Sequence, residues 1–284
     1  MRFTYLIYVL CFLIFSSTAY AQQRIVSASG NVSELIVELG YTDALVGVDT
    51  TSTRPADMME ALPKVGYRRN LSAEGILSLN PDLLILAPDA GPLNVIEQIK
   101  RAQVPVMTIQ DDKDVDGLIE DIQLIANTLK VPEKAKAIID KIRHEEQLIQ
   151  QTRQSYHRQP KIAILMDGST GRLSGLGGDT AGQGLLAIVG ADNVFADQFT
   201  GVKAVSLEAL MAEPADMIIL STFSKDKKVD TLTPANEHYP ELALSHAGQN
   251  NCIFRIDAGQ ALGFGLQLTE AALQIAQRVN HCLP

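Results

Sequence analysis

The sequence contains only three cysteines, no long run of lysine or arginine, and a net charge of -9 at pH 7. An acidic chain without a basic stretch lacks the surface that neutralises phosphate backbones, so we do not expect nucleic acid as a partner. The Gly-x-Ser-x-Gly elbow, the His-Glu-x-x-His pair and the phosphate-binding loop of nucleotide enzymes are also absent. These absences disfavour the common hydrolases and nucleotide-dependent enzymes, and we expect a protein that is not an enzyme.

Long apolar runs are scarce as well, since only residues 6–15 form one, and they follow the positively charged Arg2. This run is shorter than the roughly 20 residues that span a bilayer. The small residues Ala19 and Ala21 behind it are typical of a cleavage site. We expect residues 1–21 to be a signal peptide that is removed on export, and the mature protein to be soluble.

The cysteines have different fates under this prediction. Cys11 lies inside the apolar run and is not preceded by the small residues of a lipoprotein site, so we expect it to leave with the signal peptide. Cys252 and Cys282 remain in an exported protein, where a disulfide can persist. A disulfide between the two and a pair of separate buried thiols are both open at this point, whereas a metal site would need more ligands.

The mature sequence alternates short apolar runs with amphipathic stretches, which is typical of strands and helices in turn. The first half gives strands at 24–27, 45–48, 83–86 and 104–109, and helices at 32–39, 72–79 and 95–103. Asn31 and Ser72 stand where caps would begin two of these helices. Alternation of this kind predicts an α/β fold with a parallel sheet covered by helices.

Residues 132–157 interrupt this alternation with one long, charged helical pattern that no turn residue breaks. A strand pattern at 161–165 then restarts the alternation. We therefore predict two α/β lobes, at 22–131 and 158–284, joined by a connector helix. A stiff connector restricts the lobes to small hinge motions.

Two segments about 134 residues apart resemble each other, as expected for two lobes built on one plan. Residues 71–77 and 205–211 each combine a capping serine with a glutamate two positions later. A proline follows each predicted helix, at Pro81 and Pro214, and an aspartate then precedes an apolar strand. Pseudo-symmetry of the two lobes explains these matches, and chance similarity between two βα units is the alternative.

One stretch of the sequence, residues 65–75 (VGYRRNLSAEG), is distinctive. Together with residues 47–53, 181–190 and 257–272 it closely resembles the periplasmic haem-binding proteins of bacterial haem ABC importers. The resemblance covers nearly the whole mature chain and implies a class III periplasmic binding protein, with two Rossmann-like lobes and a haem cleft between them. Binders of siderophores or cobalamin share this fold and are the alternative.

The resemblance implies that Tyr67 is the axial ligand of ferric haem b. Ferric iron is a hard acid and a phenolate is a hard anionic donor, so tyrosine suits this role. In an extended loop alternate residues point the same way, so we expect Arg69 to reach the phenolate or a haem propionate. Arg68 then points elsewhere and is a solvated surface charge, or at most a propionate contact.

The second lobe is expected to cover the other face of the haem. Some relatives carry a histidine soon after the first strand of this lobe, but residues 165–171 contain none, which predicts five-coordinate iron. Met166 could touch the haem face, although a methionine there more often packs in the core. Lys225 and Lys227, with Lys228 beside them, occupy the loop where some relatives contact a propionate.

Glu74 and Glu208 occupy equivalent positions in the two similar segments. A glutamate in the first turn of a helix is favoured by the helix dipole, by about 0.3–1 kcal/mol, which is one explanation for both. The resemblance implies another, in which one glutamate per lobe pairs with arginines of an inner-membrane ABC permease. It also implies a periplasmic monomer that serves this permease and its ATPase in iron acquisition, with an outer-membrane haem receptor upstream.

Overall fold

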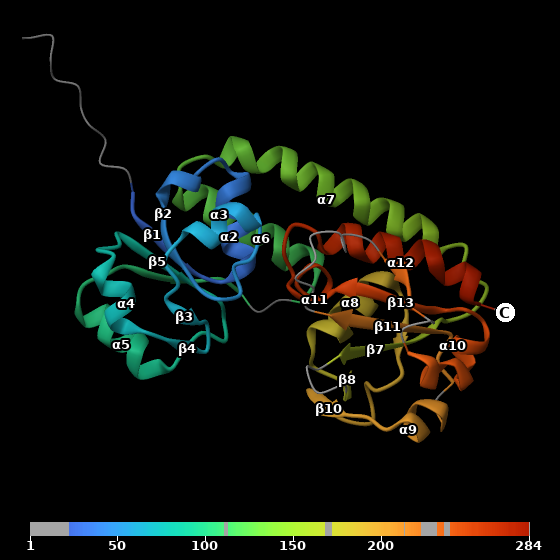
Figure 1. Cartoon of the computed structure of the whole chain (residues 1–284). Helices are drawn as coiled ribbons and strands as arrows, with labels where there is room; N and C mark the ends of the chain where they lie inside the picture. Colours follow the sequence, from blue (N-terminus) through green and yellow to red (C-terminus); the bar gives the residue numbers. More distant parts are fainter. Residues whose placement is uncertain are drawn as a thin grey trace, which may run out of the picture.

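A computed structural model describes residues 23–110, 113–167, 172–212, 214–222, 232–235 and 239–283. The predicted signal peptide, together with Lys225, Lys227 and Lys228, lies outside the described residues. Two α/β lobes are bridged by one long helix (Figure 1). In the part of the chain that is described, no helix has both the length and the apolar character that a membrane span requires.

The first lobe is built on a four-stranded parallel sheet with the order β2-β1-β5-β6. Its strands are β1 (Ile25–Ala28), β2 (Leu45–Val48), β5 (Leu83–Leu86) and β6 (Val106–Thr108). Its helical segments are α2 (Gly30–Glu38), the 3-10 turn η1 (Thr42–Ala44), α3 (Ala56–Ala61), α4 (Ala73–Ser78), α5 (Leu93–Arg101) and α6 (Val115–Thr128). The predictions for β2 and β5 are confirmed to the residue.

Side chains of the first sheet alternate between two hydrophobic cores. Ile25 and Ile85 join the core on one face, whereas Val26 and Leu84 join the core on the other. Successive residues of a strand point to opposite faces, so a strand buried on both sides must be apolar throughout. This explains why β2 and β5 appear in the sequence as runs without a polar residue, whereas β1 contains the buried Ser27.

The second lobe carries a larger mixed sheet with the order β10-β8-β7-β11-β13-β12, and β9 also pairs with β7. Its strands are β7 (Lys161–Asp167), β8 (Leu173–Leu176), β9 (Asp192–Asn193), β10 (Val202–Ala204), β11 (Met217–Thr222), β12 (Thr233–Pro234) and β13 (Ile253–Asp257). Its helical segments are α8 (Ala181–Val189), α9 (Leu207–Ala212), the 3-10 turn η3 (Pro240–Leu244), α10 (His246–Gln249), α11 (Ala258–Leu262) and α12 (Leu268–Cys282). Its central strands β7, β11 and β13 run parallel, so both lobes have the predicted α/β class.

The connector predicted between the lobes is α7 (Pro132–Arg153), which packs against α6 of the first lobe and α12 of the second (Figure 1). It ends at Arg153 and not at His157, because residues 154–158 turn back toward β7. Ile142 and Ile149 on its buried side belong to one continuous core that reaches both sheets. The lobes are therefore joined by packed side chains as well as by the helix.

Polar contacts reinforce this junction. Arg54, in the loop after β2, donates hydrogen bonds to Asp257 at 3.0 Å and to Gln267 at 2.7 Å, both in the second lobe. Gln267 in turn donates to Glu34 of α2 at 3.2 Å. These contacts join one lobe directly to the other, and they fix the orientation in which any surface between the lobes is presented.

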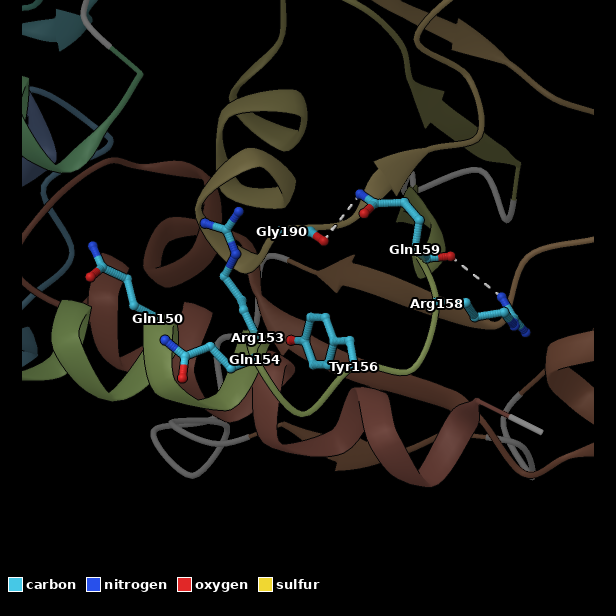
Figure 2. A pocket seen from close by; sticks show the side chains of 7 residues that line it. All are labelled: Gln150, Arg153, Gln154, Tyr156, Arg158, Gln159 and Gly190. Atoms are coloured by element: carbon cyan, nitrogen blue, oxygen red, sulfur yellow. Dashed lines mark hydrogen bonds between the residues drawn. The ribbon is translucent and has the colours of Figure 1, made fainter.

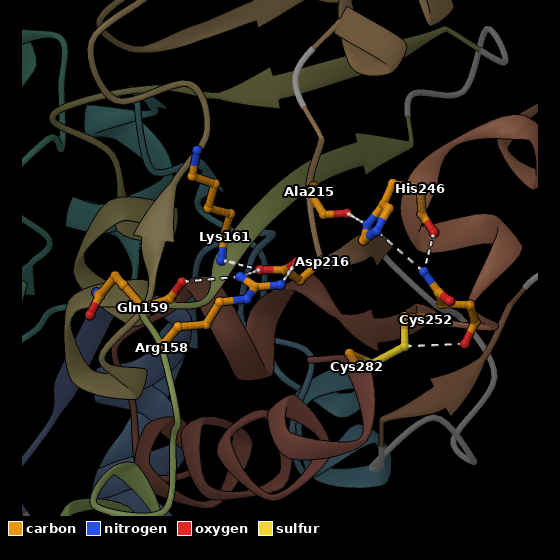
Figure 3. Close-up of polar contacts among 9 residues, drawn as sticks. Arg158, Gln159, Lys161, Ala215, Asp216, His246, Cys252 and Cys282 are labelled. Atoms are coloured by element: carbon orange, nitrogen blue, oxygen red, sulfur yellow. Dashed lines mark hydrogen bonds and ion pairs between the residues drawn. A yellow bond between two sulfur atoms is a disulfide. The ribbon is translucent and has the colours of Figure 1, made fainter. Parts of the chain in front are cut away.

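The internal similarity in the sequence corresponds to equivalent places in the two lobes. The order β1-β5-β6 in the first sheet matches β7-β11-β13 in the second. Asp82 accepts a hydrogen bond from the backbone N–H of Arg24 at 2.8 Å, and Asp216 accepts one from the N–H of Lys161 at 2.8 Å (Figure 3). Each aspartate thus ties the start of one sheet strand to the start of its neighbour, and the predicted pseudo-symmetry is confirmed.

Helix caps agree with the sequence at one place and differ at another. The Ser72 side chain accepts the N–H of Gly75 at 3.0 Å and begins α4 as predicted. The prediction that Asn31 caps α2 is wrong, because Ser29 occupies the extended N-cap position and Asn31 lies within the helix. The carbonyl oxygen of Ser29 accepts the N–H of Ser33 at 3.0 Å, which closes the first helical turn.

Cys252 and Cys282 form a disulfide in this structure, with their Cα atoms 5.7 Å apart. It joins the residue before β13 to the last residue of α12, and both cysteines are buried. Of the two arrangements that the sequence allowed, the structure therefore contains the paired one. Because the pair lies 30 residues apart, it closes a loop that contains β13, α11 and α12.

Candidate functional site

Tyr67 lies on a small hairpin that is separate from the main sheet of the first lobe. β3 (Gly66–Tyr67) pairs antiparallel with β4 (Asn70–Leu71), and Arg68 and Arg69 form the turn between them. The hairpin lies on the side of the first lobe that faces β8 and β10 of the second (Figure 1). Tyr67 is 40% exposed, which is high for a large aromatic side chain.

The hairpin is held by backbone hydrogen bonds from two other loops. The N–H of Thr50 donates to the carbonyl of Gly66 at 2.9 Å. The N–H of Gly91 donates to the carbonyl of Arg68 at 2.8 Å, and the N–H of Leu71 donates to Gly91 at 2.9 Å. The loops that follow β2 and β5 thus fix the backbone beneath the exposed tyrosine.

Gly66 must be glycine for this arrangement to form. Its φ angle is 104°, in the region that L side chains rarely adopt, and a Cβ there would lie 2.6 Å from the carbonyl oxygen of Asn70. The residue immediately before Tyr67 therefore sets the path of the hairpin, which the sequence shows only as one glycine among several.

Arg68 and Arg69 share one carboxylate. Arg68 Nε and Nη2 lie 2.7 and 2.9 Å from the two oxygens of Asp89, and Arg69 Nε lies 2.7 Å from Asp89 Oδ2. The Arg68 guanidinium also lies over the ring of Tyr67, 5.6 Å from its centroid. Two cations, one anion and one phenol therefore form a single cluster.

This geometry corrects the prediction for the two arginines. We expected Arg69 to share a side with Tyr67 and Arg68 to be a solvated charge, because residues in an extended chain alternate. The chain turns at these positions and does not continue as a strand, so alternation fails and Arg68 is the residue that covers the tyrosine ring. The Arg68 side chain is 29% exposed, whereas that of Arg69 is 58% exposed.

Charges in the cluster stabilise each other. Hydrogen bonds to Asp89 are the largest influence on Arg68 and raise the pKa of its guanidinium, so it stays protonated. Partial burial by itself would raise the pKa of Asp89, but hydrogen bonds from Arg68 and Arg69 outweigh it and lower that pKa. Asp89 is therefore ionised near neutral pH and offsets one of the two positive charges.

A second acidic residue supports the hairpin from beneath. Asp49 is fully buried at the end of β2, where it accepts hydrogen bonds from the N–H and hydroxyl of Thr51, at 3.0 and 2.7 Å, and from the hydroxyl of Ser52 at 2.9 Å. Burial is the largest influence on nearby Lys64 and lowers its pKa, against the attraction of Asp49. The loop that Asp49 orders contains Thr50, which holds Gly66.

Sequence reasoning missed both Asp49 and Asp89. A signal was present, because each follows the carboxyl end of a buried parallel strand, β2 or β5, and this is the edge where α/β sheets bind ligands. The partners of Asp89 lie about 20 residues earlier in the chain, on the hairpin. No local pattern links the two segments.

The other residues considered for the haem pocket do not belong to the cluster around Tyr67. Met166 lies on β7 of the second lobe, partly buried and packed against the core. Lys225 and Lys227 lie outside the described residues. His246 lies at the start of α10 with Nδ1 3.2 Å from the carbonyl oxygen of Ala215 (Figure 3). Among the described residues, no cluster of histidine, cysteine or carboxylate side chains is arranged to hold a metal ion.

Glu74 and Glu208 are both exposed in the first turns of the equivalent helices α4 and α9. Glu208 accepts hydrogen bonds from its own N–H and from the Ser206 hydroxyl, which lower its pKa. Ser206 also accepts the N–H of Ala209 at 3.2 Å. One exposed acid per lobe is thus displayed on a helix that a serine side chain caps.

A hollow of the described surface lies elsewhere, where α7 ends against the second lobe (Figure 2). It has a volume of about 520 Å³ and is lined by Gln150, Arg153, Gln154, Tyr156, Arg158, Gln159 and Gly190. The Tyr156 hydroxyl lies 3.3 Å from the carbonyl oxygens of Val189 and Ala276, and burial raises its pKa to about 12. This tyrosine is tied to the protein, in contrast to the exposed Tyr67.

Comparison with known proteins agrees with this architecture. A vitamin B12-binding protein of Yersinia pestis (strain Pestoides F) is 28% identical over 250 residues, which cover 87% of each chain. The periplasmic heme-binding protein RhuT of Roseiflexus sp. RS-1 has a TM-score of 0.78 at 28% identity, covering 93% of this chain and 100% of that one. The periplasmic heme-binding protein HutB of Vibrio cholerae has a TM-score of 0.73 at 32% identity, covering 91% and 98%.

The family model described as periplasmic binding protein matches residues 25–259, which include both sheets and α7. Chains of this kind are recognised by two α/β lobes and a long connecting helix, both of which are present here. The chain belongs to the periplasmic binding protein family.

Proposed function

We propose that this protein captures ferric haem b between its two lobes, with Tyr67 as the iron ligand, and delivers it to an inner-membrane ABC permease. One observation carries the proposal, namely that an exposed tyrosine lies on a fixed hairpin, with an arginine over its ring. This chain resembles the heme-binding proteins RhuT and HutB along nearly its whole length, which supports haem as the molecule that it carries.

The chemistry of Tyr67 suits an oxidised iron. An unperturbed phenol titrates near pH 10, so it must lose its proton to the metal on binding, and ferric iron supplies that driving force. The Arg68 guanidinium lies 5.6 Å from the ring centroid and covers one side of the tyrosine. A phenolate oxygen is an established axial ligand for haem iron.

The haem propionates need cationic partners at the edge of the binding surface. Arg69 is the best candidate, because its side chain is 58% exposed. Lys225 and Lys227 remain proposals for the second lobe, and Met166 remains a proposed contact with the haem face. We propose that Arg68 makes at most a weaker contact with a propionate than Arg69 does, because its Nε and Nη2 already donate hydrogen bonds to Asp89.

Tyr67 is proposed to be the only protein ligand of the iron, which is then five-coordinate, or six-coordinate if a water occupies the sixth position. The second lobe offers no histidine in residues 165–171, where a second protein ligand would be expected. His246 lies beside the Ala215 carbonyl, just before the start of β11. Because β7 and β11 are parallel, this is the end of the sheet opposite to residues 165–167 at the end of β7. His246 is therefore a poor candidate for this role.

Delivery is proposed to use Glu74 and Glu208, which project from equivalent helices of the two lobes. Pairing of each with an arginine of the permease would orient the carrier across the transport path. The protein is proposed to act as a non-enzymatic periplasmic monomer, after removal of residues 1–21, with lobes at 22–131 and 158–284 joined by the connector helix α7 (Pro132–Arg153). An outer-membrane haem receptor would supply the ligand.

Cobalamin is the alternative ligand, favoured by the vitamin B12-binding relatives. A corrinoid binder needs no phenolate, so that function does not explain an exposed tyrosine with an arginine over its ring. The relevant experiment mixes the mature protein with ferric haem or with cyanocobalamin and measures affinity and the visible spectrum. A high-spin, tyrosinate-type haem spectrum that is lost in Tyr67→Phe supports the proposal.

Tyr41→Phe is the matched control, because Tyr41 is a half-buried tyrosine of the same lobe whose ring faces Lys134. It should leave the haem spectrum unchanged. Tighter binding of cyanocobalamin than of haem by the wild-type protein, or an identical haem spectrum in Tyr67→Phe, would overturn the proposed function.

A further inference from the structure

Asp89 holds the two hairpin arginines in different ways. Arg68 contacts both carboxylate oxygens, Nε to Oδ1 at 2.7 Å and Nη2 to Oδ2 at 2.9 Å. Arg69 directs both of its contacts, from Nε at 2.7 Å and Nη2 at 2.6 Å, to Oδ2 alone. The first arrangement is the bidentate one that arginine and carboxylate prefer, and the second is not.

Exposure separates the same two arginines. The Arg68 side chain is 29% exposed and its guanidinium is confined between Asp89 and the ring of Tyr67. The Arg69 side chain is 58% exposed, and Asp89 is the one anion that pairs with it among the described residues. Arg69 can therefore leave Asp89 at little cost, whereas Arg68 cannot leave without uncovering the tyrosine.

The backbone that carries Asp89 is held on both sides. The N–H of Ala90 donates to the carbonyl of Ala87 at 3.1 Å and closes a turn around Asp89. The N–H of Gly91, two residues later, donates to the carbonyl of Arg68 on the hairpin at 2.8 Å. A ligand carboxylate that approaches Arg69 thus competes with an anion whose backbone is anchored to the hairpin, and the exchange is expected to occur by movement of the more exposed Arg69 side chain.

We propose that Asp89 is a specificity-determining counter-ion, which holds Arg69 available for a carboxylate of the ligand. The inference rests on the proposed function, in which the ligand is a porphyrin with two propionates. Asp89 competes with the propionate for Arg69, so it lowers the affinity for carboxylate-bearing ligands and speeds their release. The same competition leaves ligands without a carboxylate unaffected.

The size of the effect follows from the exposure of the pair. Exposed ion pairs hold their partners weakly, by up to about a factor of five in an equilibrium constant. Removing the competing charge with Asp89→Asn should therefore tighten ferric haem binding by roughly two- to fivefold. Loss of Arg69 in Arg69→Ala should weaken haem binding by roughly tenfold, as expected for one charge-assisted hydrogen bond.

The experiment compares ferric haem with ferric haem dimethyl ester, whose propionates carry no charge, by titration of the wild-type protein, Asp89→Asn, Asp89→Glu and Arg69→Ala. We expect Asp89→Asn and Arg69→Ala to change haem affinity in opposite directions and to leave ester affinity unchanged. Asp89→Glu keeps the charge and should bind haem as the wild type does. Asp140→Asn removes one charge from an exposed ion pair on α7 and controls for net charge.

Three outcomes are distinguishable. Tighter haem binding by Asp89→Asn, with no change for the ester or for Asp140→Asn, supports the inference. Haem binding that is unchanged or weaker in Asp89→Asn, or an equal change for the ester, overturns it while leaving the proposed function intact. Absence of haem binding by the wild-type protein overturns the proposed function and this inference together.

Discussion

Arg158 holds Asp216 with both arms of its guanidinium, at 2.7 and 2.8 Å, beside the start of β7 (Figure 3). The same carboxylate accepts the N–H of Lys161 at 2.8 Å, and its side chain is only 6% exposed. Burial opposes the ionisation of Asp216, but hydrogen bonds from Arg158 and Lys161 outweigh it and lower the pKa. A buried acid of the second lobe is thus kept charged to join β7 and β11.

Asp216→Asn is expected to destabilise the protein by about 1–3 kcal/mol, because the amide cannot replace the charge-assisted bonds. The folded protein binds this proton more weakly than the unfolded chain does, so the stabilisation is complete above about pH 5 and is lost as the pH falls below about 4. Urea unfolding at several pH values should give a shallower acid loss in the variant. An equal pH slope in both proteins would contradict this assignment.

Gly66→Ala should displace the hairpin that carries Tyr67. The new Cβ would meet the carbonyl oxygen of Asn70 at 2.6 Å in a left-handed backbone, so we expect a loss of about 2–3 kcal/mol in the free energy of unfolding. Gly201→Ala is the control, since Gly201 has a φ of 75° but no atom within 4 Å of a Cβ, and should cost about 1 kcal/mol. Thermal unfolding measures both, and only the first should alter the haem spectrum.

Reduction of the Cys252–Cys282 disulfide should lower stability by about 2–4 kcal/mol, because the bond restricts the unfolded chain over a separation of 30 residues. Urea unfolding with and without a thiol reductant measures the difference. The Cys252→Ser and Cys282→Ser double variant should already be destabilised and should show no response to the reductant. A wild-type midpoint that the reductant does not change would argue that the cysteines are unpaired in solution.

Arg54→Ala should loosen the junction of the lobes without unfolding either one. Its contacts with Asp257 and Gln267 are partly exposed, so their loss should cost about 1 kcal/mol or less. Faster hydrogen exchange around β13 and α2, and a larger radius in small-angle X-ray scattering, are the expected signs. Lys136→Ala removes an exposed pair within α7 and should change neither measurement.

Charge reversal at Glu74 and Glu208, the proposed docking residues, tests delivery separately from capture. Glu74→Lys combined with Glu208→Lys should abolish haem uptake by cells that depend on this carrier, while purified protein binds haem as before. Glu133→Lys, on the exposed first turn of α7, adds a like charge away from both helices and should transport normally. Normal uptake by the double variant would exclude these glutamates from docking.

The sequence predicted those features that depend on near neighbours in the chain. Unbroken apolar runs located β2 and β5 to the residue, because strands buried on both faces must be apolar throughout. The serine at Ser72 marked the start of α4, because its side chain can reach only the N–H groups of the next turn. Repetition of these local signals revealed the second lobe.

Features that depend on distant segments were predicted wrongly or not at all. The side on which Arg68 and Arg69 lie was misjudged, because Gly91 and Thr50 hold the hairpin from other loops and turn the chain there. Asp89 went unnoticed for the same reason, since nothing near it in the sequence indicates two arginines as partners. The Ser29 cap displaced the expected Asn31 because the helix begins where β1 ends.

By itself the sequence determined the two-lobed α/β class, the connector helix and the exposed acid on each lobe, because periodicity, capping and charge act within a few residues. The tertiary structure alone decided which arginine covers Tyr67, which carboxylate the arginines share, and how Arg54 joins the lobes. These contacts form where segments from separate parts of the chain lie close together. Their interaction energies depend on the distance between the groups in space and not on their separation in the sequence.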